Sequence, residues 1–151
     1  ANNDGIYDVP VEYDFMCLYE NGLHMRVANQ SKLRNGMGTY WQGNKGWIHV
    51  HRGGIKASDD NILKEEIGDG ETKLYESSNH IQNFLECIKT RKETITPVET
   101  GHRSISVGLL GEIAMLTEQK LYWDPLAEKF TDNNVYATRL LNRPYRNPWK
   151  L

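Results

Sequence analysis

The sequence contains little cysteine and no long apolar run. Its two cysteines, Cys17 and Cys87, lie far apart, so neither a disulfide framework nor a paired-cysteine metal site is predicted, and we expect both to be buried thiols. No run of about 18 apolar residues is present, which excludes a predicted transmembrane helix. No basic start followed by an apolar segment is visible either. We therefore expect no membrane partner.

An excess of charge of one sign is also missing. The 151 residues carry 18 basic and 20 acidic side chains, for a formal net charge of -2. A phosphate backbone or an anionic lipid surface is bound by a broad basic face, and this composition does not provide one. Nucleic acid is therefore not expected as a partner. The length fits one domain, and a domain of this size buries roughly 70% of the surface of its unfolded chain.

Recognisable catalytic and cofactor motifs are absent as well. Gly36-Met-Gly38 begins like a dinucleotide fingerprint, but Trp41 stands where that pattern continues, and a strand rather than a helix follows. No Ser-His-Asp or Cys-His spacing can be defended. His49 and His51 point to the same side of a predicted strand, but no third ligand is placed near them, and a polar, solvent-facing strand explains them equally well. We predict no catalytic, cofactor-binding or metal-binding residue.

The first half of the sequence has the pattern of an antiparallel sheet. Residues 11–19 alternate with period two, and Asn21-Gly22 supplies a tight turn into a second strand at 23–27. A second hairpin pairs Thr39 to Gln42 with Trp47 to Arg52 around a glycine-containing turn. A shorter strand at 54–57 follows, and Ser58 to Asp60 can cap a helical turn through Leu63.

In the second half the period changes to that of helices. Ser77 or Ser78 can cap a helix with an apolar stripe, and Thr96-Pro97 opens a longer helix with a capping box completed by Glu99. Gly101, Gly108 and Gly111 would allow another backbone to approach this helix closely. A strand at 121–123 and a last short helix at 134–141 complete the chain. Strands first and helices second predict an α+β fold: a mostly antiparallel open sheet with helices packed on one face.

Two groups of residues have open interpretations. His102 and Arg103 lie in the first turns of the longer helix, where backbone N–H groups favour an anion or a polar substrate, although packed polar residues would account for them as well. The four tryptophans and eight tyrosines could pack in the core, form an oligomer interface, or stack on sugar rings.

Four ordered blocks resemble the C-terminal domain of the glucose-fructose oxidoreductase / inositol dehydrogenase / MocA (Gfo/Idh/MocA) family, most closely its bacterial type. The blocks span residues 43–58, 74–89, 97–103 and 143–151. The resemblance implies a two-domain parent enzyme, in which an N-terminal Rossmann domain binds NAD or NADP and supplies a catalytic lysine from a Glu-Lys-Pro motif. It also implies an α+β second domain whose broad sheet covers the substrate and often pairs subunits.

The resemblance extends to site residues only in part. Relatives carry an aspartate and histidine for proton transfer in a helix at the start of this domain, and no Asp-x-x-x-His stretch precedes the first strand here. Loops comparable to Arg34-Asn35-Gly36 line the substrate pocket of relatives. The resemblance therefore implies substrate contacts at Arg34 and Asn35, with His102 and Arg103 as further candidates.

Taken together, we expect residues 1–151 to form a single C-terminal substrate-binding and oligomerisation domain that lacks its Rossmann domain. The parent would be an NAD- or NADP-dependent sugar or polyol oxidoreductase of carbohydrate metabolism and a homo-oligomer through the sheet face. The fragment would be inactive alone. The alternative is a non-enzymatic carbohydrate-binding or scaffold module built on the same sheet. The chain starts at Ala1, so a preceding segment could carry an export signal, and both a cytoplasmic and a periplasmic location stay open.

Overall fold

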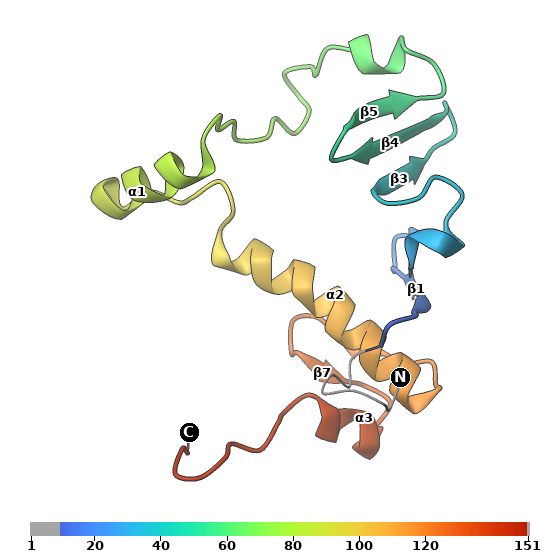
Figure 1. Ribbon diagram of the computed structural model, residues 1–151, viewed down its shortest axis with the longest axis vertical. Helices are drawn as coiled ribbons and strands as arrows, with labels where there is room; N and C mark the ends of the chain where they lie inside the picture. Colours follow the sequence, from blue (N-terminus) through green and yellow to red (C-terminus); the bar gives the residue numbers. More distant parts are fainter. Residues whose placement is uncertain (1–9, 151) are drawn as a thin grey trace. The chain divides into compact units, whose positions relative to one another are not determined.

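A computed structural model describes residues 10–150 of the chain. Its internal contacts group residues 29–102 into one compact unit, and the preceding segment together with residues 103–150 into another. The elements form antiparallel sheets and helices, which confirms the predicted α+β class (Figure 1). We call the unit that contains both chain ends the terminal unit and residues 29–102 the central unit, and describe each by itself.

The terminal unit begins with the predicted hairpin, in which β1 (Asp14–Leu18) pairs antiparallel with β2 (His24–Ala28). The Asn-Gly turn forms as expected. Gly22 has a φ of +83°, its N–H donates to the Tyr19 carbonyl at 2.9 Å, and the Asn21 side chain accepts from Leu23 N–H at 3.0 Å.

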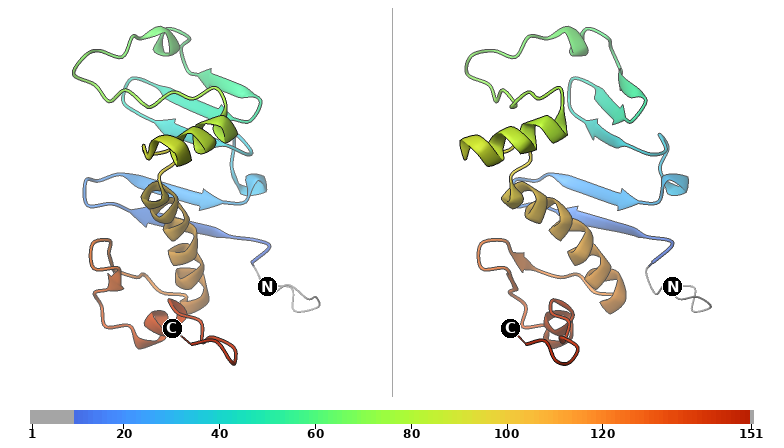
Figure 2. Two further views of the ribbon diagram at one scale, coloured as in Figure 1. Left: turned by 90° about the vertical axis from the view of Figure 1, so that its left-hand side faces the viewer. Right: turned by 60° about the vertical axis from the view of Figure 1, so that its left-hand side comes forward.

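Helix α2 (Val98–Thr117) contributes its residues from Arg103 onward to the terminal unit. Gly111 is buried there because the ring of Phe15 from β1 lies directly over it, and a Cβ at this position would overlap the ring. The hairpin and α2 lie side by side in both views of Figure 2. Close approach was expected at three glycines. The close neighbour of Gly111 is the Phe15 ring rather than another backbone, and a Cβ on Gly101 or Gly108 would meet nothing within 4 Å.

The apolar core of the terminal unit joins α2 to the end of the chain. Ile113, Phe130 and Ala137 are buried at its centre. Phe130 comes from β7 (Lys129–Phe130), whose pairing with β6 (Trp123–Asp124) was not predicted, and Ala137 from α3 (Val135–Leu140). Partly buried side chains surround them: Leu110, Leu121, Trp123, Leu140 and Leu141.

The short helix α3 starts where it was predicted. The Asn134 side chain accepts from Ala137 N–H at 2.9 Å, which satisfies one of the N–H groups that a helix start leaves without a partner.

The central unit contains a three-stranded antiparallel sheet, β3 (Thr39–Gln42), β4 (Trp47–His51) and β5 (Gly54–Ala57), in that order. These strands confirm the second predicted hairpin and the short strand after it. Gly43 N–H donates to the Gly46 carbonyl at 2.8 Å and closes the turn. Two short 3-10 helices flank the sheet, η1 (Gln30–Lys32) and η2 (Ile62–Lys64).

Helix α1 (His80–Thr90) ends the central unit, and its cap differs from the prediction. Asn79 rather than Ser77 or Ser78 caps it, because the Asn79 side chain reaches Gln82 N–H at 2.9 Å. The Ser77 hydroxyl instead donates to the Asn79 carbonyl at 3.1 Å. The four side chains of the apolar stripe are between 47% and 71% exposed: Ile81, Phe84, Leu85 and Ile88.

The two cysteines are free thiols. Cys87 is buried, as predicted, and its Sγ donates to the Glu93 carbonyl at 3.2 Å. Cys17 is half-buried, and this burial raises the pKa of its thiol, so the uncharged form is favoured. Between residues 10 and 150, no helix has the length and apolar character needed to cross a membrane.

Candidate functional site

A hollow of about 370 Å³ opens on one face of the β3–β4–β5 sheet. The strand register explains which side chains meet there. Trp47, His49 and His51 alternate along β4 and share a face, and Lys56 of β5 stands opposite His49. We call this cavity the sheet hollow. Its lining consists of Asn35, Met37, Trp47, His49, His51, Arg52, Gly53 and Lys56.

His49 forms the buried part of the hollow, with only 7% of its surface exposed. A solvent-facing strand, one of the interpretations of the histidine pair, therefore does not account for His49. Its ring lies 5.2 Å from that of His51 and 6.4 Å from that of Tyr40, measured between ring centroids.

Gly38 contributes to this burial. A Cβ there would overlap the Val50 carbonyl oxygen and would stand 2.7 Å from Nε2 of His49, so the backbone passes directly against the imidazole. The φ of Gly38 is +134°, a conformation that side-chain-bearing residues rarely adopt. Both conditions require glycine at this position.

The second histidine has a defined hydrogen-bonding pattern. Nδ1 of His51 accepts from Gly53 N–H at 3.0 Å, which leaves Nε2 as the N–H donor of the neutral ring. Within residues 10–150 no group of three or more His, Cys, Asp or Glu side chains comes together in a way that could hold a metal ion. The Nε2–H of His51 is thus a hydrogen-bond donor on the face that forms the hollow.

Trp47 gives the hollow an aromatic wall. Its ring stacks on Tyr40 with centroids 5.5 Å apart and planes at 29°. Its backbone N–H donates to the Ser58 hydroxyl at 3.0 Å, which ties β4 to the end of β5. An indole held in this way can present a flat apolar surface beside polar groups, as small-ligand sites usually do.

The charged side chains of the hollow are all basic. Arg52 and Lys56 line it, no Asp or Glu does, and neither cation forms an ion pair with any residue in the described range 10–150. By contrast, Lys45 in the β3–β4 turn lies 4.0 Å from the carboxylate of Glu65.

The fold and the hollow can be compared with known protein families. A family model described as "Oxidoreductase family, C-terminal alpha/beta domain" matches residues 13–151. This chain belongs to the Gfo/Idh/MocA oxidoreductase family. No curated protein and no solved structure matches it.

In the Gfo/Idh/MocA family this type of domain follows an N-terminal Rossmann domain. The Gly36-Met-Gly38 stretch of this chain does not form a dinucleotide-binding loop. The glycines at 36 and 38 lead into β3 rather than into a helix, and the space where a cradle would open at Gly38 is filled by Val50 and His49.

The resemblance implies two substrate contacts in the loop before β3, and one of the two lines the sheet hollow. Asn35 belongs to the lining, whereas Arg34 is exposed and does not. A turn closed by Gly36 N–H and the Leu33 carbonyl, 3.1 Å apart, positions both residues.

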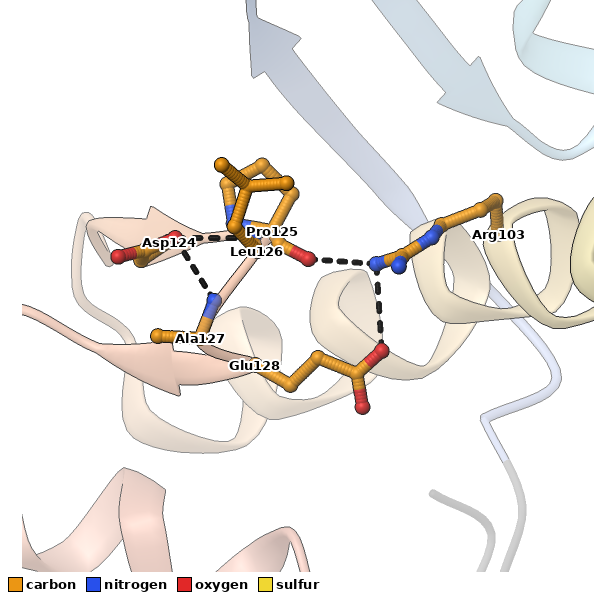
Figure 3. Close-up of polar contacts among 6 residues, drawn as sticks. All are labelled: Arg103, Asp124, Pro125, Leu126, Ala127 and Glu128. Carbon is orange, nitrogen blue, oxygen red and sulfur yellow. Dashed lines mark hydrogen bonds and ion pairs between the residues drawn. The ribbon is translucent and has the colours of Figure 1, made fainter.

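Arg103 lies in the terminal unit, and its guanidinium contacts the β6–β7 turn (Figure 3). Nη1 donates to the Pro125 carbonyl at 2.6 Å and lies 3.2 Å from Oε1 of Glu128. These contacts give Arg103 a structural role in joining α2 to the turn. His102, which precedes it, is exposed.

The same turn depends on Asp124. Oδ1 of Asp124 accepts from the backbone N–H groups of Leu126 and Ala127 at 2.9 and 3.0 Å (Figure 3). Hydrogen bonds from Ala127 and Leu126 stabilise the carboxylate and lower the pKa of Asp124.

Sequence reasoning missed Trp47, Arg52 and Lys56 as members of the site. A usable signal existed, because alternation along a strand predicts that Trp47 shares a face with the two histidines. The contribution of Lys56 depends on the pairing of β4 with β5, and that register is not encoded in any short motif.

Proposed function

We propose that this chain is the substrate-binding and oligomerisation domain of an NAD- or NADP-dependent sugar or polyol oxidoreductase. Residues 1–151 would act as one C-terminal domain, catalytically incomplete alone, and the dinucleotide would be held by a Rossmann domain. The family supplies the oxidoreductase context. The sheet hollow is the observation that carries the substrate class.

The hollow combines the groups that a sugar or polyol needs. The face of Trp47 can pack on the C–H face of a ring, while Asn35 and the His51 Nε2–H donate to hydroxyl groups. Its volume of about 370 Å³ is at the small end of the range for ligand sites, which suits a monosaccharide better than a longer chain.

The role of this domain follows from these contacts. Side chains on a paired strand are held more firmly than side chains on a loop, so β4 can fix the orientation of a bound polyol. The apolar wall would exclude water from one side of it. Arg34, His102 and Arg103 remain candidate contacts, and Arg103 would have to leave its place at the β6–β7 turn to act as one.

The opposite face of the same sheet supports the oligomerisation part of the proposal. Trp41, Val50 and Ile55 point away from the histidines and are 54%, 39% and 52% exposed. Exposed apolar side chains gathered on one surface are typical of a protein interface. We infer that this face pairs subunits.

Ligand titration followed by NMR tests the proposal. We expect a panel of monosaccharides and polyols to shift the signals of Trp47 and His51, and we expect no micromolar affinity for NAD or NADP. Trp47→Ala should weaken sugar binding about tenfold or more, because it removes the stacking surface. Trp41→Ala, on the other face of the sheet, is the matched control and should leave binding unchanged.

Two outcomes would contradict this function. Micromolar dinucleotide binding to the chain alone would mean that the cofactor site lies here. Sugar binding that survives Trp47→Ala, or that shifts only signals outside the hollow, would place the ligand elsewhere. The alternative, a non-enzymatic carbohydrate-binding module, would be favoured by two results together: a sugar binds in the hollow, and the reading frame upstream encodes no Rossmann domain.

A further inference from the structure

The sheet hollow carries positive charge that a neutral sugar does not require. Arg52 and Lys56 both line it, and the lining contains no carboxylate. In the terminal unit, Arg26 has an acidic partner, Asp14, at 2.7 Å. The two cations of the hollow have none within residues 10–150.

The backbone determines where these charges stand. Lys56 is opposite His49 in the β4–β5 register, so its side chain rises from the face that forms the hollow. Arg52 directly follows β4, in the turn where Gly53 N–H donates to His51. Paired backbone therefore places Lys56, and the turn between β4 and β5 places Arg52.

Two cations in one lining that contains no carboxylate favour an anionic ligand. A guanidinium binds a carboxylate or phosphate through two parallel hydrogen bonds, and a lysine ammonium adds a point charge. The remaining lining groups, Trp47 and Asn35, suit a sugar ring and its hydroxyls. The lining thus combines two cations that suit an anionic group with side chains that suit a sugar.

We propose that the ligand of the sheet hollow is an acidic sugar, one whose ring or chain carries a carboxylate or phosphate group. Arg52 and Lys56 bind the anionic group, and Trp47 packs on the sugar. The inference rests on the proposed function and narrows its substrate class from sugars and polyols in general to anionic ones.

Calorimetric titration of the 151-residue chain tests it with three probes: D-glucuronate, D-glucose 6-phosphate and D-glucose. We expect at least one anionic probe to bind about tenfold or more tightly than glucose, since a hydrogen bond to a charged group contributes more than one between neutral groups. The two anionic arms distinguish a carboxylate from a phosphate. Added salt should weaken the binding of the anionic probes and leave that of glucose unchanged.

Variants assign the effect to the two cations. Arg52→Gln and Lys56→Gln should each reduce the affinity for the preferred anionic probe about tenfold while leaving that for glucose within about twofold. Lys45→Gln removes a cation from the same sheet outside the hollow and should change neither affinity. Arg52→Lys should restore part of the loss, which a variant that merely fails to fold would not allow.

The possible failures can be told apart. The acidic-sugar inference is overturned if glucose binds in the hollow as tightly as both anionic probes and if Arg52→Gln and Lys56→Gln leave the affinity for the anionic probes unchanged. That result leaves the proposed function standing. Binding of no probe overturns both.

Discussion

The two compact units bury different kinds of side chain. The terminal unit buries Ile113, Phe130 and Ala137, all apolar. The central unit buries His49, Asn83 and the thiol of Cys87. Burying a polar group is tolerated only when its hydrogen bonds are made, so the central unit depends on directed contacts where the terminal unit depends on apolar area. The two units therefore differ in the chemistry of their buried side chains.

Both units leave large apolar side chains exposed, such as Leu109 and Val135 in the terminal unit. In the central unit, both the reverse face of the sheet and the stripe on α1 remain exposed. A unit that leaves such surface outside its own core gains stability when something covers it. Because the buried apolar cluster of Ile113, Phe130 and Ala137 lies in the terminal unit, we expect that unit to contribute most of the stability that the chain has by itself.

The largest effect should come from the apolar core. Phe130→Ala should lower the free energy of unfolding by about 3–5 kcal/mol, because it removes a ring that meets Trp123 edge-on with centroids 5.2 Å apart. Urea denaturation measures the change. Leu126→Ala is the control in the neighbouring turn. Because Leu126 is 93% exposed, this substitution should lower the free energy of unfolding by less than about 0.5 kcal/mol. Equal losses in the two variants would refute the assignment of the core.

A smaller effect is expected from the polar interior of the central unit. Asn83 accepts from Ile95 N–H at 3.0 Å and donates to the Tyr75 hydroxyl at 2.6 Å. Asn83→Ala leaves the Ile95 N–H without a partner and should cost about 1–3 kcal/mol. The same denaturation assay applies, with exposed Asn61→Ala as the control. A loss as large as that of Phe130→Ala would remove the distinction between the two units.

The smallest effect is a dependence on pH in the β6–β7 turn. The pKa of Asp124 is lower in the folded than in the unfolded chain, so its ionised form stabilises the fold above the ordinary aspartate pKa near 4. That contribution is lost as the pH falls through the lowered pKa. Asp124→Asn keeps an oxygen acceptor but loses the charge. The stability advantage of the wild type over this variant should therefore shrink on acidification. An advantage independent of pH would show that the carboxylate charge contributes nothing.

Local rules predicted much of this fold. The Asn21-Gly22 hairpin and the start of α3 at Asn134 depend on neighbours only a few positions away, and both formed as expected. The predicted N-cap of α1 was wrong by one or two residues, because Ser77, Ser78 and Asn79 are all polar residues that can cap a helix. Such competition is decided by geometry that residue type alone does not determine.

The site was harder to predict because its contacts are not local. The burial of His49 on β4 depends on contact with Gly38, which directly precedes the neighbouring strand β3. No short sequence pattern encodes that contact. Arg103 likewise meets Pro125, which is 22 positions away. Asn35 could be found only through family resemblance. The remaining lining required the register of β4 with β5.

Gly38 limits how the sheet hollow could change during evolution. Any side chain there must displace the Val50 carbonyl or the His49 ring, so one wall of the hollow has a fixed shape. A relative that acquires a new ligand has to do so through Trp47, Arg52 and Lys56, whose side chains can be exchanged without moving the backbone. Divergence in specificity should therefore be concentrated on one side of the hollow, with the glycine side unchanged.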